Sequence, residues 1–271
     1  MRITLLVNRD LASNVALNNL LPELSKEHDL SVYYSERVGQ PPSNHALATL
    51  AFFEQTLSNH ILFPLIDHRQ QRGALATFKA LETYLLRPMQ SLNNPNSPQG
   101  LDRLRRDSPD LVLSIRYGRI LHQAAIDIPK LGVLNLHSGK LPDYRGVMAT
   151  FRAMLKMDTH LCTTLHWVEN ASIDTGRIVG IQCAPREPNA CYLMNVLSLY
   201  QSGCRAIIGA IERLESGEPL GGSPPEQRGD YYSFPEAETL WQFHEAGHRL
   251  VDPEALTYFL SSYRTSEPQR L

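Results

Sequence analysis

Several features that would place this chain in a special class are missing from its sequence. No apolar run reaches the ~18 residues that a membrane-spanning helix needs, and the N-terminal stretch MRITLLVNRD is too short and too soon polar for a signal peptide. The 26 lysines and arginines nearly balance the 28 aspartates and glutamates, so a formal net charge of −2 gives no general attraction to nucleic acid or to an acidic membrane. We therefore expect a cytoplasmic protein that does not bind a membrane, and nucleic acid is an unfavoured partner unless a local basic patch attracts it.

Cysteine is also scarce and shows no functional spacing. The four cysteines form no CxxC pair and no zinc-ligand pattern: Cys162, Cys183, Cys191 and Cys204. We expect all four to be free, buried or half-buried thiols in a reducing cytosol. What the sequence does contain is ordinary for a globular protein, with 42% hydrophobic and 20% charged residues.

Short β-branched runs alternate with amphipathic helical stretches over the first 185 residues. We expect strands at 2–8, 30–34, 111–115, 132–137, 163–168 and 178–182. We also expect a helix that opens at residues 41–43 and runs to about Leu57, and a loop over 93–100. The apolar run Ile61–Ile66 is ambiguous because Pro64 interrupts it, and the stretch from Tyr231 to Pro235 looks like an aromatic tail. The alternation of strands and helices predicts an α/β fold, with a mostly parallel twisted sheet, helices on both faces and a ligand site at the carboxyl ends of the strands. After Pro185 the pattern is mainly helical, and its long helix from Leu193 to Leu214 could serve a homodimer. The predicted division is an α/β domain over 1–185 and a helical C-terminal extension over 186–271.

The most informative stretch surrounds two polar residues on an otherwise apolar strand. Asn135 and His137 are two positions apart, so their side chains leave the same face of the strand. An amide beside an imidazole suits the stabilisation of an oxyanion. The segment Leu141-Pro142-Asp143-Tyr144-Arg145-Gly146 then follows as a turn. On spacing alone, Asn135 could equally be a strand-end residue and His137 a satisfied, half-buried histidine.

A carboxylate further along the chain could complete this site. Asp174 lies in Ser172-Ile173-Asp174-Thr175-Gly176, between two predicted strands. Together with an imidazole it could relay a proton between an attacking amine and a leaving nitrogen. Asp-Thr-Gly is also good turn chemistry, so a purely structural role stays open for this residue.

Taken together, N-x-H, L-P-x-x-R-G and I-D-T-G at these positions resemble the motifs of the folate-dependent formyltransferases. The resemblance covers roughly residues 2–182 in layout and residues 111–182 in motif detail. It implies a Rossmann-like formyltransferase domain over 1–185, a 10-formyltetrahydrofolate donor and no metal. Asn135 and His137 would hold the formyl oxygen, and Asp174 would assist proton transfer. The residues implied to bind the folate are Tyr117, Gly118, Arg119, Ile120 and Leu121 on one side, and Asn170, Ala171, Ser172 and Ile173 on the other.

Departures from the family pattern bear on the acceptor. Ser138-Gly139-Lys140 stands where the family often has Pro-Ser-Leu, so the turn could be flexible and Lys140 could face an acidic acceptor. Asn8-Arg9-Asp10 lacks the glycines that cradle a ribose phosphate, which argues against glycinamide ribonucleotide. The region after Pro185 is short and helical, which argues against a tRNA acceptor. We expect a small-molecule amine, first a nucleotide-linked amino sugar and second an amino-acid or hydroxylamine side chain.

Two other functions fit parts of the sequence. A 10-formyltetrahydrofolate hydrolase would use the same three residues with water, although such enzymes usually carry a preceding regulatory domain and this chain begins at its first strand. A zinc hydrolase is suggested by His244-Glu245-Ala246-Gly247-His248, which matches H-E-x-x-H. That motif lacks a clear third ligand downstream, and Gly247 costs a helix ~1 kcal/mol relative to alanine.

Overall fold

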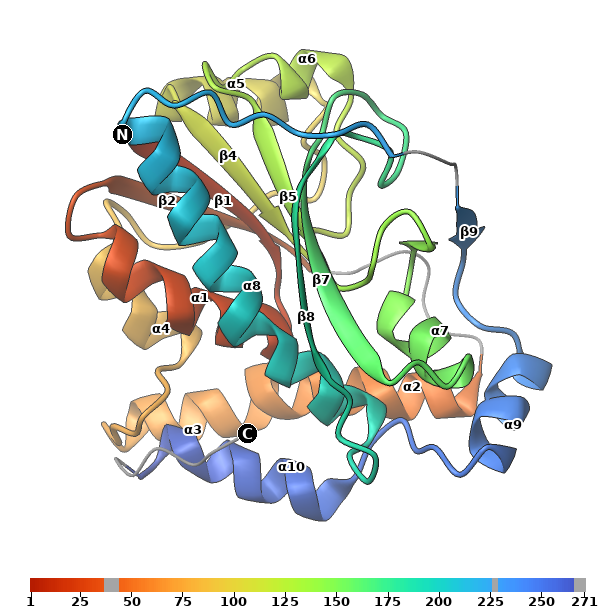
Figure 1. Ribbon diagram of the computed structural model, residues 1–271. Coiled ribbons are helices and arrows are strands. Elements are labelled where there is room, and N and C mark those ends of the chain that lie inside the picture. The colour runs from red at the N-terminus through yellow and green to blue at the C-terminus, as the bar shows by residue number, and fades with distance from the viewer. Residues whose placement is uncertain (37–43, 226–228, 266–271) are drawn as a thin grey trace.

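The computed structural model describes residues 1–36, 44–225 and 229–265. Its centre is a single seven-stranded sheet (Figure 1). The strands, in spatial order, are β3 (Gln90–Ser91), β2 (Asp29–Ser35), β1 (Arg2–Asn8), β4 (Leu111–Ile115), β5 (Val133–His137), β7 (His160–Trp167) and β8 (Ile178–Pro185). The first five are parallel, whereas β7 runs antiparallel to both β5 and β8. The predicted α/β class and the mostly parallel sheet are confirmed.

Helices cover both faces of this sheet because its strands alternate two sets of apolar side chains. Leu5 of β1 and Leu113 of β4 belong to the larger core, which faces α1 (Leu11–Leu24), α4 (Phe78–Leu81) and α8 (Tyr192–Glu215). Leu6 and Val112, their neighbours in the chain, belong to a smaller core under α5 (Pro98–Asp107) and α6 (Gln123–Ile126). In Figure 1, α1 and α8 cross the front of the sheet while α5 and α6 lie above. Period-2 alternation on a sheet buried on both sides produces this layering.

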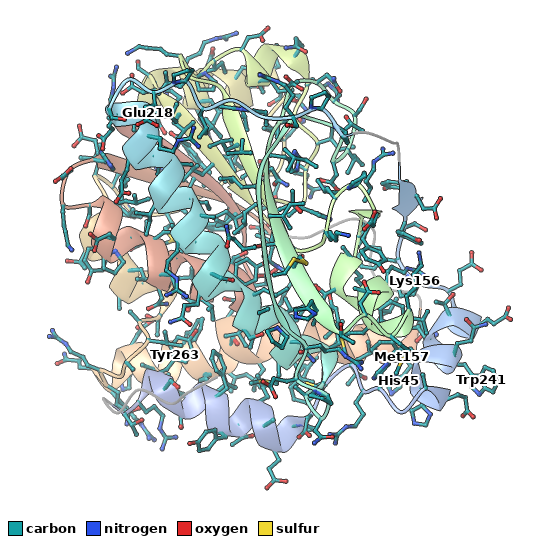
Figure 2. The ribbon with its side chains drawn as sticks, viewed as in Figure 1. His45, Lys156, Met157, Glu218, Trp241 and Tyr263 are labelled. Atoms are coloured by element: carbon teal, nitrogen blue, oxygen red, sulfur yellow. A yellow bond between two sulfur atoms is a disulfide. The ribbon has the colours of Figure 1, made fainter. Side chains whose placement is uncertain are left out.

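The long helix after residue 185 is part of the main core. Leu193, Val196, Tyr200 and Ile207 on α8 are at most 1% exposed and pack with α1 and β7. The apolar stripe that we considered as a dimer face is therefore covered within the chain. The rest of the C-terminal segment contains α9 (Ala237–Glu245), α10 (Pro253–Leu260) and the 3-10 turn η3 (Ser261–Tyr263). Tyr263, labelled in Figure 2, is fully buried and donates a hydrogen bond to Asn14 of α1 at 2.6 Å.

A long helical segment lies along the lower side of the molecule in Figure 1. It consists of α2 (His45–Ala51), the π-helical η1 (Phe52–Leu62) and α3 (Phe63–His68). We predicted a helix only to about Leu57, and the apolar run from Ile61, which Pro64 made ambiguous, is in fact helical. Pro64 is accommodated because it falls in the first turn of α3. The predicted start at residues 41–43 lies outside the described residues.

Two shorter predictions need correction. The loop expected over 93–100 ends at Ser97, whose hydroxyl caps α5 by accepting from the Gly100 N–H. Tyr231 and its neighbours were read as a tail, yet β9 (Asp230–Tyr232) pairs in parallel with β6 (Tyr144–Gly146) in a small second sheet. A three-residue strand has no periodicity to detect. The remaining elements are α7 (Ala149–Leu155) and the 3-10 turn η2 (Glu82–Tyr84).

The expectation of four free thiols is wrong for two of them. Cys162 on β7 and Cys183 on β8 are directly opposite each other and joined by a disulfide. Their Cα atoms are 4.1 Å apart, close to the ~4.5 Å of a non-hydrogen-bonded antiparallel pair. The two cysteines are 21 positions apart in the chain, and this spacing hid the pairing because it does not show strand register. Cys191 and Cys204 are free and buried, as expected.

None of the helices in the described residues combines the length and apolar character that crossing a bilayer requires.

Candidate active site

The carboxyl ends of β1, β4 and β5 open into a cavity of about 620 Å³. Asn135, His137 and Asp174 all line it, and so does every residue that we expected to contact the folate. Two stretches of chain therefore meet there, Tyr117–Leu121 after β4 and Asn170–Ile173 between β7 and β8. Such an edge is where ligands bind in parallel α/β sheets.

Asp174 is brought to the two histidines by the loop between β7 and β8. Its Oδ2 atom lies 3.5 Å from His137 Nδ1, and its Oδ1 atom lies 3.5 Å from His166 Nε2. Oδ2 also accepts a 2.8 Å hydrogen bond from the Gly146 N–H. The backbone of Asp174 has a φ of 54°, a left-handed conformation that is uncommon outside glycine. The loop thus adopts a costly conformation that points this carboxylate into the site.

Burial alone would raise the pKa of Asp174. The nearby His137 and His166 rings and the Gly146 N–H outweigh that effect and lower its pKa from 3.8 to about 2. The carboxylate is therefore ionised at any pH near neutrality. This ionised carboxylate can stabilise positive charge that develops on the His137 ring if the ring passes a proton to a leaving nitrogen.

His137 is fixed from its other side as well. Its Nε2–H donates to the Tyr144 carbonyl at 2.7 Å, and the ring is only 8% exposed. Gly139 makes room for this ring, because a Cβ there would lie 2.9 Å from His137 Nε2 and 2.4 Å from the Ala149 Cβ. The Ser138-Gly139 departure from the family pattern therefore reflects close packing and not a loose turn. Lys140 pairs with Asp143 at 2.9 Å on the surface and does not line the cavity.

His166 is a site residue that sequence reasoning missed. It lies opposite Asn135 in the antiparallel pairing of β5 with β7, and its Nε2 accepts from Asn135 Nδ2 at 3.0 Å. Its Nδ1–H donates to the Trp167 carbonyl at 2.9 Å. The ring orients the Asn135 amide and leaves the second amide N–H available to the cavity. A polar residue inside an apolar strand was the available signal, but only the register of β7 against β5 places it.

Arg145 does not act as a free cation at the edge of the site. Its guanidinium donates to the Ile173 carbonyl at 3.1 and 3.2 Å, and to the Gly229 carbonyl at 3.3 Å. It therefore ties the L-P-x-x-R-G turn to the residue before Asp174. This contact joins the two motifs in space.

The predicted folate segment after β4 is held in place from the sheet. Tyr117 donates its hydroxyl to the Leu92 carbonyl, and the Gly118 N–H donates to Ser35 Oγ at 3.0 Å. Tyr117 packs with the smaller core, so one wall of the cavity is apolar and rigid. A flat aromatic ligand fits such a wall, and backbone groups near the strand end can bind its edge.

The zinc motif does not form a zinc site. The helix α9 ends at Glu245, and Gly247 has a φ of 81°, so His244 and His248 are not one helical turn apart. His244 is 80% exposed, whereas His248 is buried against Phe243 and contacts the Met154 carbonyl at 3.1 Å. Within the described residues, no group of three or more His, Cys, Asp or Glu side chains could hold a metal ion.

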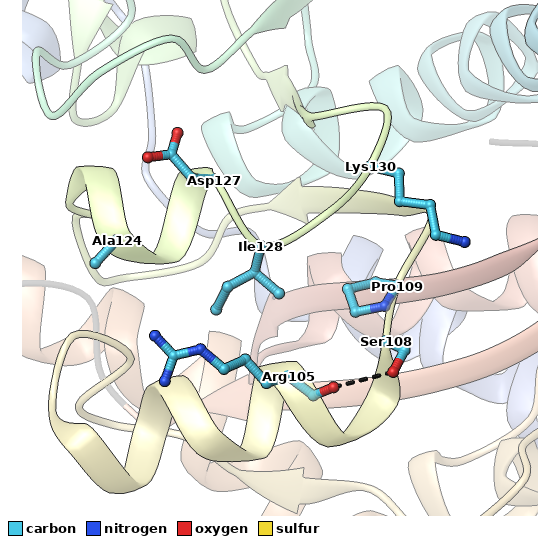
Figure 3. A pocket seen from close by; sticks show the side chains of 7 residues that line it. All are labelled: Arg105, Ser108, Pro109, Ala124, Asp127, Ile128 and Lys130. Atoms are coloured by element: carbon cyan, nitrogen blue, oxygen red, sulfur yellow. Dashed lines mark hydrogen bonds between the residues drawn. The ribbon is translucent and has the colours of Figure 1, made fainter.

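A second hollow, of about 510 Å³, lies between α5 and α6 (Figure 3). Arg105, Asp127 and Lys130 surround it, and it contains none of the motif residues. It lacks an imidazole or a buried carboxylate, so we assign the chemistry to the cavity at the strand ends.

Comparison with known proteins agrees with this geometry. A family model described as formyl transferase matches residues 52–185, which contain all three motifs. The segment that carries the three motifs belongs to the formyl transferase family. Methionyl-tRNA formyltransferase from Chlamydia pneumoniae is 30% identical over 156 residues, 56% of this chain and 48% of that protein. The chain spans about half the length of the curated relatives it matches.

Solved structures share the fold at low identity. A sugar N-formyltransferase from Shewanella sp. superimposes with a TM-score of 0.56 and 15% identity, covering 86% of this chain and 77% of its own. HypX from Aquifex aeolicus, in complex with tetrahydrofolic acid, superimposes with a TM-score of 0.55 and 17% identity. The match covers 88% of this chain and 30% of the HypX chain. This formyl transferase domain therefore has the expected Rossmann-like architecture.

The acid sensitivity of the Asp174 cluster can be predicted from its pKa. A carboxyl whose pKa is lower in the folded chain stabilises the fold above its ordinary pKa, and this stability is lost as the pH falls toward the folded value. For a shift from 3.8 to about 2 the contribution is about 2 kcal/mol. We expect the free energies of unfolding of wild type and Asp174→Asn to differ near neutral pH and to converge toward pH ~2. Urea unfolding of both proteins across this pH range measures the difference in their free energies of unfolding. A difference that stays constant with pH would contradict the prediction.

Proposed function

We propose that this protein moves a formyl group from 10-formyltetrahydrofolate to a primary amine of a small acceptor. The observation that carries the proposal is the convergence of Asn135, His137 and Asp174 at one end of a cavity with a rigid apolar wall. The tetrahydrofolate in the complex of the HypX neighbour supports the donor class. The sugar N-formyltransferase neighbours support a small acceptor, with an amino sugar first and an amino acid or hydroxylamine second.

The chemistry assigns one task to each side chain. The unprotonated amine attacks the formyl carbon, and the formyl oxygen becomes an oxyanion that receives a hydrogen bond from the second Asn135 amide N–H. For His137 to donate to the same oxygen, its Nε2–H must leave the Tyr144 carbonyl, which accepts it in the absence of substrate. The bond from the formyl carbon to the folate nitrogen then breaks. The proton lost by the amine passes to the leaving nitrogen, with Asp174 stabilising the protonated imidazole. Asn135, His137 and Asp174 are each held in position by a hydrogen bond or an ion pair, which limits the movement of side chains that the reaction requires.

Donor binding can be measured without knowing the acceptor. Calorimetric titration of metal-free protein with a stable 10-formyltetrahydrofolate analogue is expected to give micromolar affinity. Tyr117→Ala should weaken it by at least ~10-fold, because a large apolar contact to the ring is lost. Tyr258→Ala is a matched control, since that tyrosine is 62% exposed on α10. No binding at millimolar ligand would overturn the proposed donor.

Transfer and hydrolysis are distinguished by the product. With 10-formyltetrahydrofolate and a panel of small amines, mass spectrometry should detect an acceptor carrying an added formyl group. Formate release at the same rate with and without every amine would instead identify a hydrolase, which would use the same three residues with water.

A further inference from the structure

The cavity has two halves, one on each face of the sheet. Tyr117, Leu121 and Val168 line it and pack with the smaller core, under α5 and α6. On the opposite face it is lined by Leu47, Leu50 and Tyr192, which belong to the larger core. The first half contains the proposed folate wall. The second, which we call the α8-side half, is lined by none of the residues that we expect to contact the folate.

An ion cluster forms the floor of the α8-side half. Arg116 follows β4 with a φ of 56°, which breaks the alternation of the strand. Its Nε lies 2.9 Å from Asp10 Oδ2, and its Nη2 lies 3.3 Å from Glu54 Oε1. The side chains of Asp10 and Glu54 are 1% and 14% exposed. One cation between two carboxylates leaves a net charge of −1 when both are ionised.

The two carboxylates differ in what they can still bind. Asp10 is saturated, because Oδ1 caps α1 through the Ser13 N–H at 2.7 Å and Oδ2 accepts from both Asn8 and Arg116. Glu54 contacts Arg116 through Oε1. Its Oε2 receives no hydrogen bond from any residue that the structure describes, and it is not enclosed, since Glu54 lines the cavity. Glu54 projects from the π-helical η1, a conformation that is common at functional positions.

We propose that the α8-side half binds the acceptor and that Glu54 selects an acceptor carrying a second, protonated amine besides the one that is formylated. This deepens the proposed function and rests on it. The free Glu54 oxygen is a partner for an ammonium group inside a poorly solvated cavity, where such a pair is stronger than in water. A phosphate placed here would be repelled by the same carboxylate. The nearby Arg116 could not compensate, because it is already paired with the carboxylates of Asp10 and Glu54. The cluster therefore favours a cationic acceptor over a nucleotide-linked one.

The charge of Glu54 is expected to change near neutral pH. Burial raises its pKa to about 7, with Asp10 adding to the rise and Arg116 opposing it. Tyr192 and Tyr200 of α8 face the same cluster, and burial keeps the pKa of each phenol above its ordinary value, so neither is charged. The carboxylate forms as the pH rises, and a bound ammonium should be held more tightly by about tenfold at pH ~8 than at pH ~6.

The test uses three probes of equal reach and different charge: 1,4-diaminobutane, 4-amino-1-butanol and 4-aminobutanoate. Each is titrated calorimetrically into the protein saturated with the stable 10-formyltetrahydrofolate analogue. We expect the diamine to bind at least ~10-fold more tightly than the other two, and more tightly with rising pH. Glu54→Gln should remove this preference, whereas Glu54→Asp should retain part of it. Glu238→Gln on the exposed side of α9 removes the same charge elsewhere and should change nothing.

Each outcome separates the acceptor proposal from the donor proposal. Equal binding of the three probes, no diamine binding at ~10 mM, or a preference that survives in Glu54→Gln would overturn the role of Glu54 while donor binding stands. Diamine binding that needs Glu54 in a protein that binds no folate analogue would support the subsite and overturn the proposed donor. Thermal melting of Glu54→Gln shows whether the variant is folded, and the pH dependence of wild type tests the same carboxylate without any substitution.

Discussion

The Asp174→Asn variant is expected to lose at least ~100-fold in kcat/KM while remaining folded. Asparagine keeps the size of the side chain and can still accept from the Gly146 N–H, but it cannot stabilise a protonated His137 3.5 Å away. Loss of one preorganised electrostatic partner in an active site costs 10²–10³ in rate. The measurement is tetrahydrofolate release with an amine acceptor identified by screening, and circular dichroism reports the fold.

The kcat/KM of Asn135→Ala and of His137→Ala should fall by a similar factor. The first substitution removes a hydrogen-bond donor to the oxyanion, and the second removes the proton carrier. Asp143→Asn is the matched control. Asp143 belongs to the same turn as the motif, pairs with Lys140 on the surface and should leave the rate unchanged. Near-normal rates in any two of the three site variants would contradict the assignment of these residues.

The second large effect is expected from a single methyl group in the loop that presents Asp174. A Cβ at Gly176 would lie 1.7 Å from the Trp167 carbonyl oxygen, which is backbone and cannot move aside cheaply. Gly176→Ala is therefore expected to destabilise the fold by ~2 kcal/mol or more. Because relief of the clash displaces the loop, kcat/KM should also fall by at least ~10-fold.

Gly180→Ala supplies a control four residues along the same segment. A Cβ there meets no heavy atom within 4 Å, so its free energy of unfolding should stay within ~0.5 kcal/mol of wild type. Urea unfolding and steady-state rates of Gly176→Ala and Gly180→Ala, measured side by side with wild type, test this prediction. If the two variants behaved alike, the close approach at Gly176 would not be what this glycine provides.

Much of the fold could be predicted from the sequence because the strands are apolar and the helices amphipathic. The β1, β4 and β5 strands were found within one residue of their bounds, and α8 was located by its apolar stripe. Local patterns of this kind reflect which face of an element is buried. The run from Ile61 to Ile66 could not be assigned in this way, because a proline inside an apolar stretch can interrupt a strand or lie in the first turn of a helix, as Pro64 does here.

The chemistry of the site was predictable only where motif residues are neighbours in the chain. Asn135 and His137 share one face of a strand, and the I-D-T-G turn identifies Asp174 by its resemblance to family members. His166 was missed because a histidine inside a strand has no signature of its own. Glu54 was missed for a similar reason, since its helical segment precedes the motif region and shows no pattern that points to a cavity.

The sequence by itself determined the class of fold, because that depends on local periodicity. The three motif residues and the two stretches expected to enclose a folate came from the resemblance of the sequence motifs to those of the formyltransferases. Only the tertiary structure decided which distant groups meet. The antiparallel register of β7 places His166 beside Asn135 and Cys162 opposite Cys183. The left-handed turn at Arg116 brings Asp10 and Glu54 together across 44 positions of the chain. Contacts of this kind depend on how elements pack, and packing is a property of the whole chain that no local pattern contains.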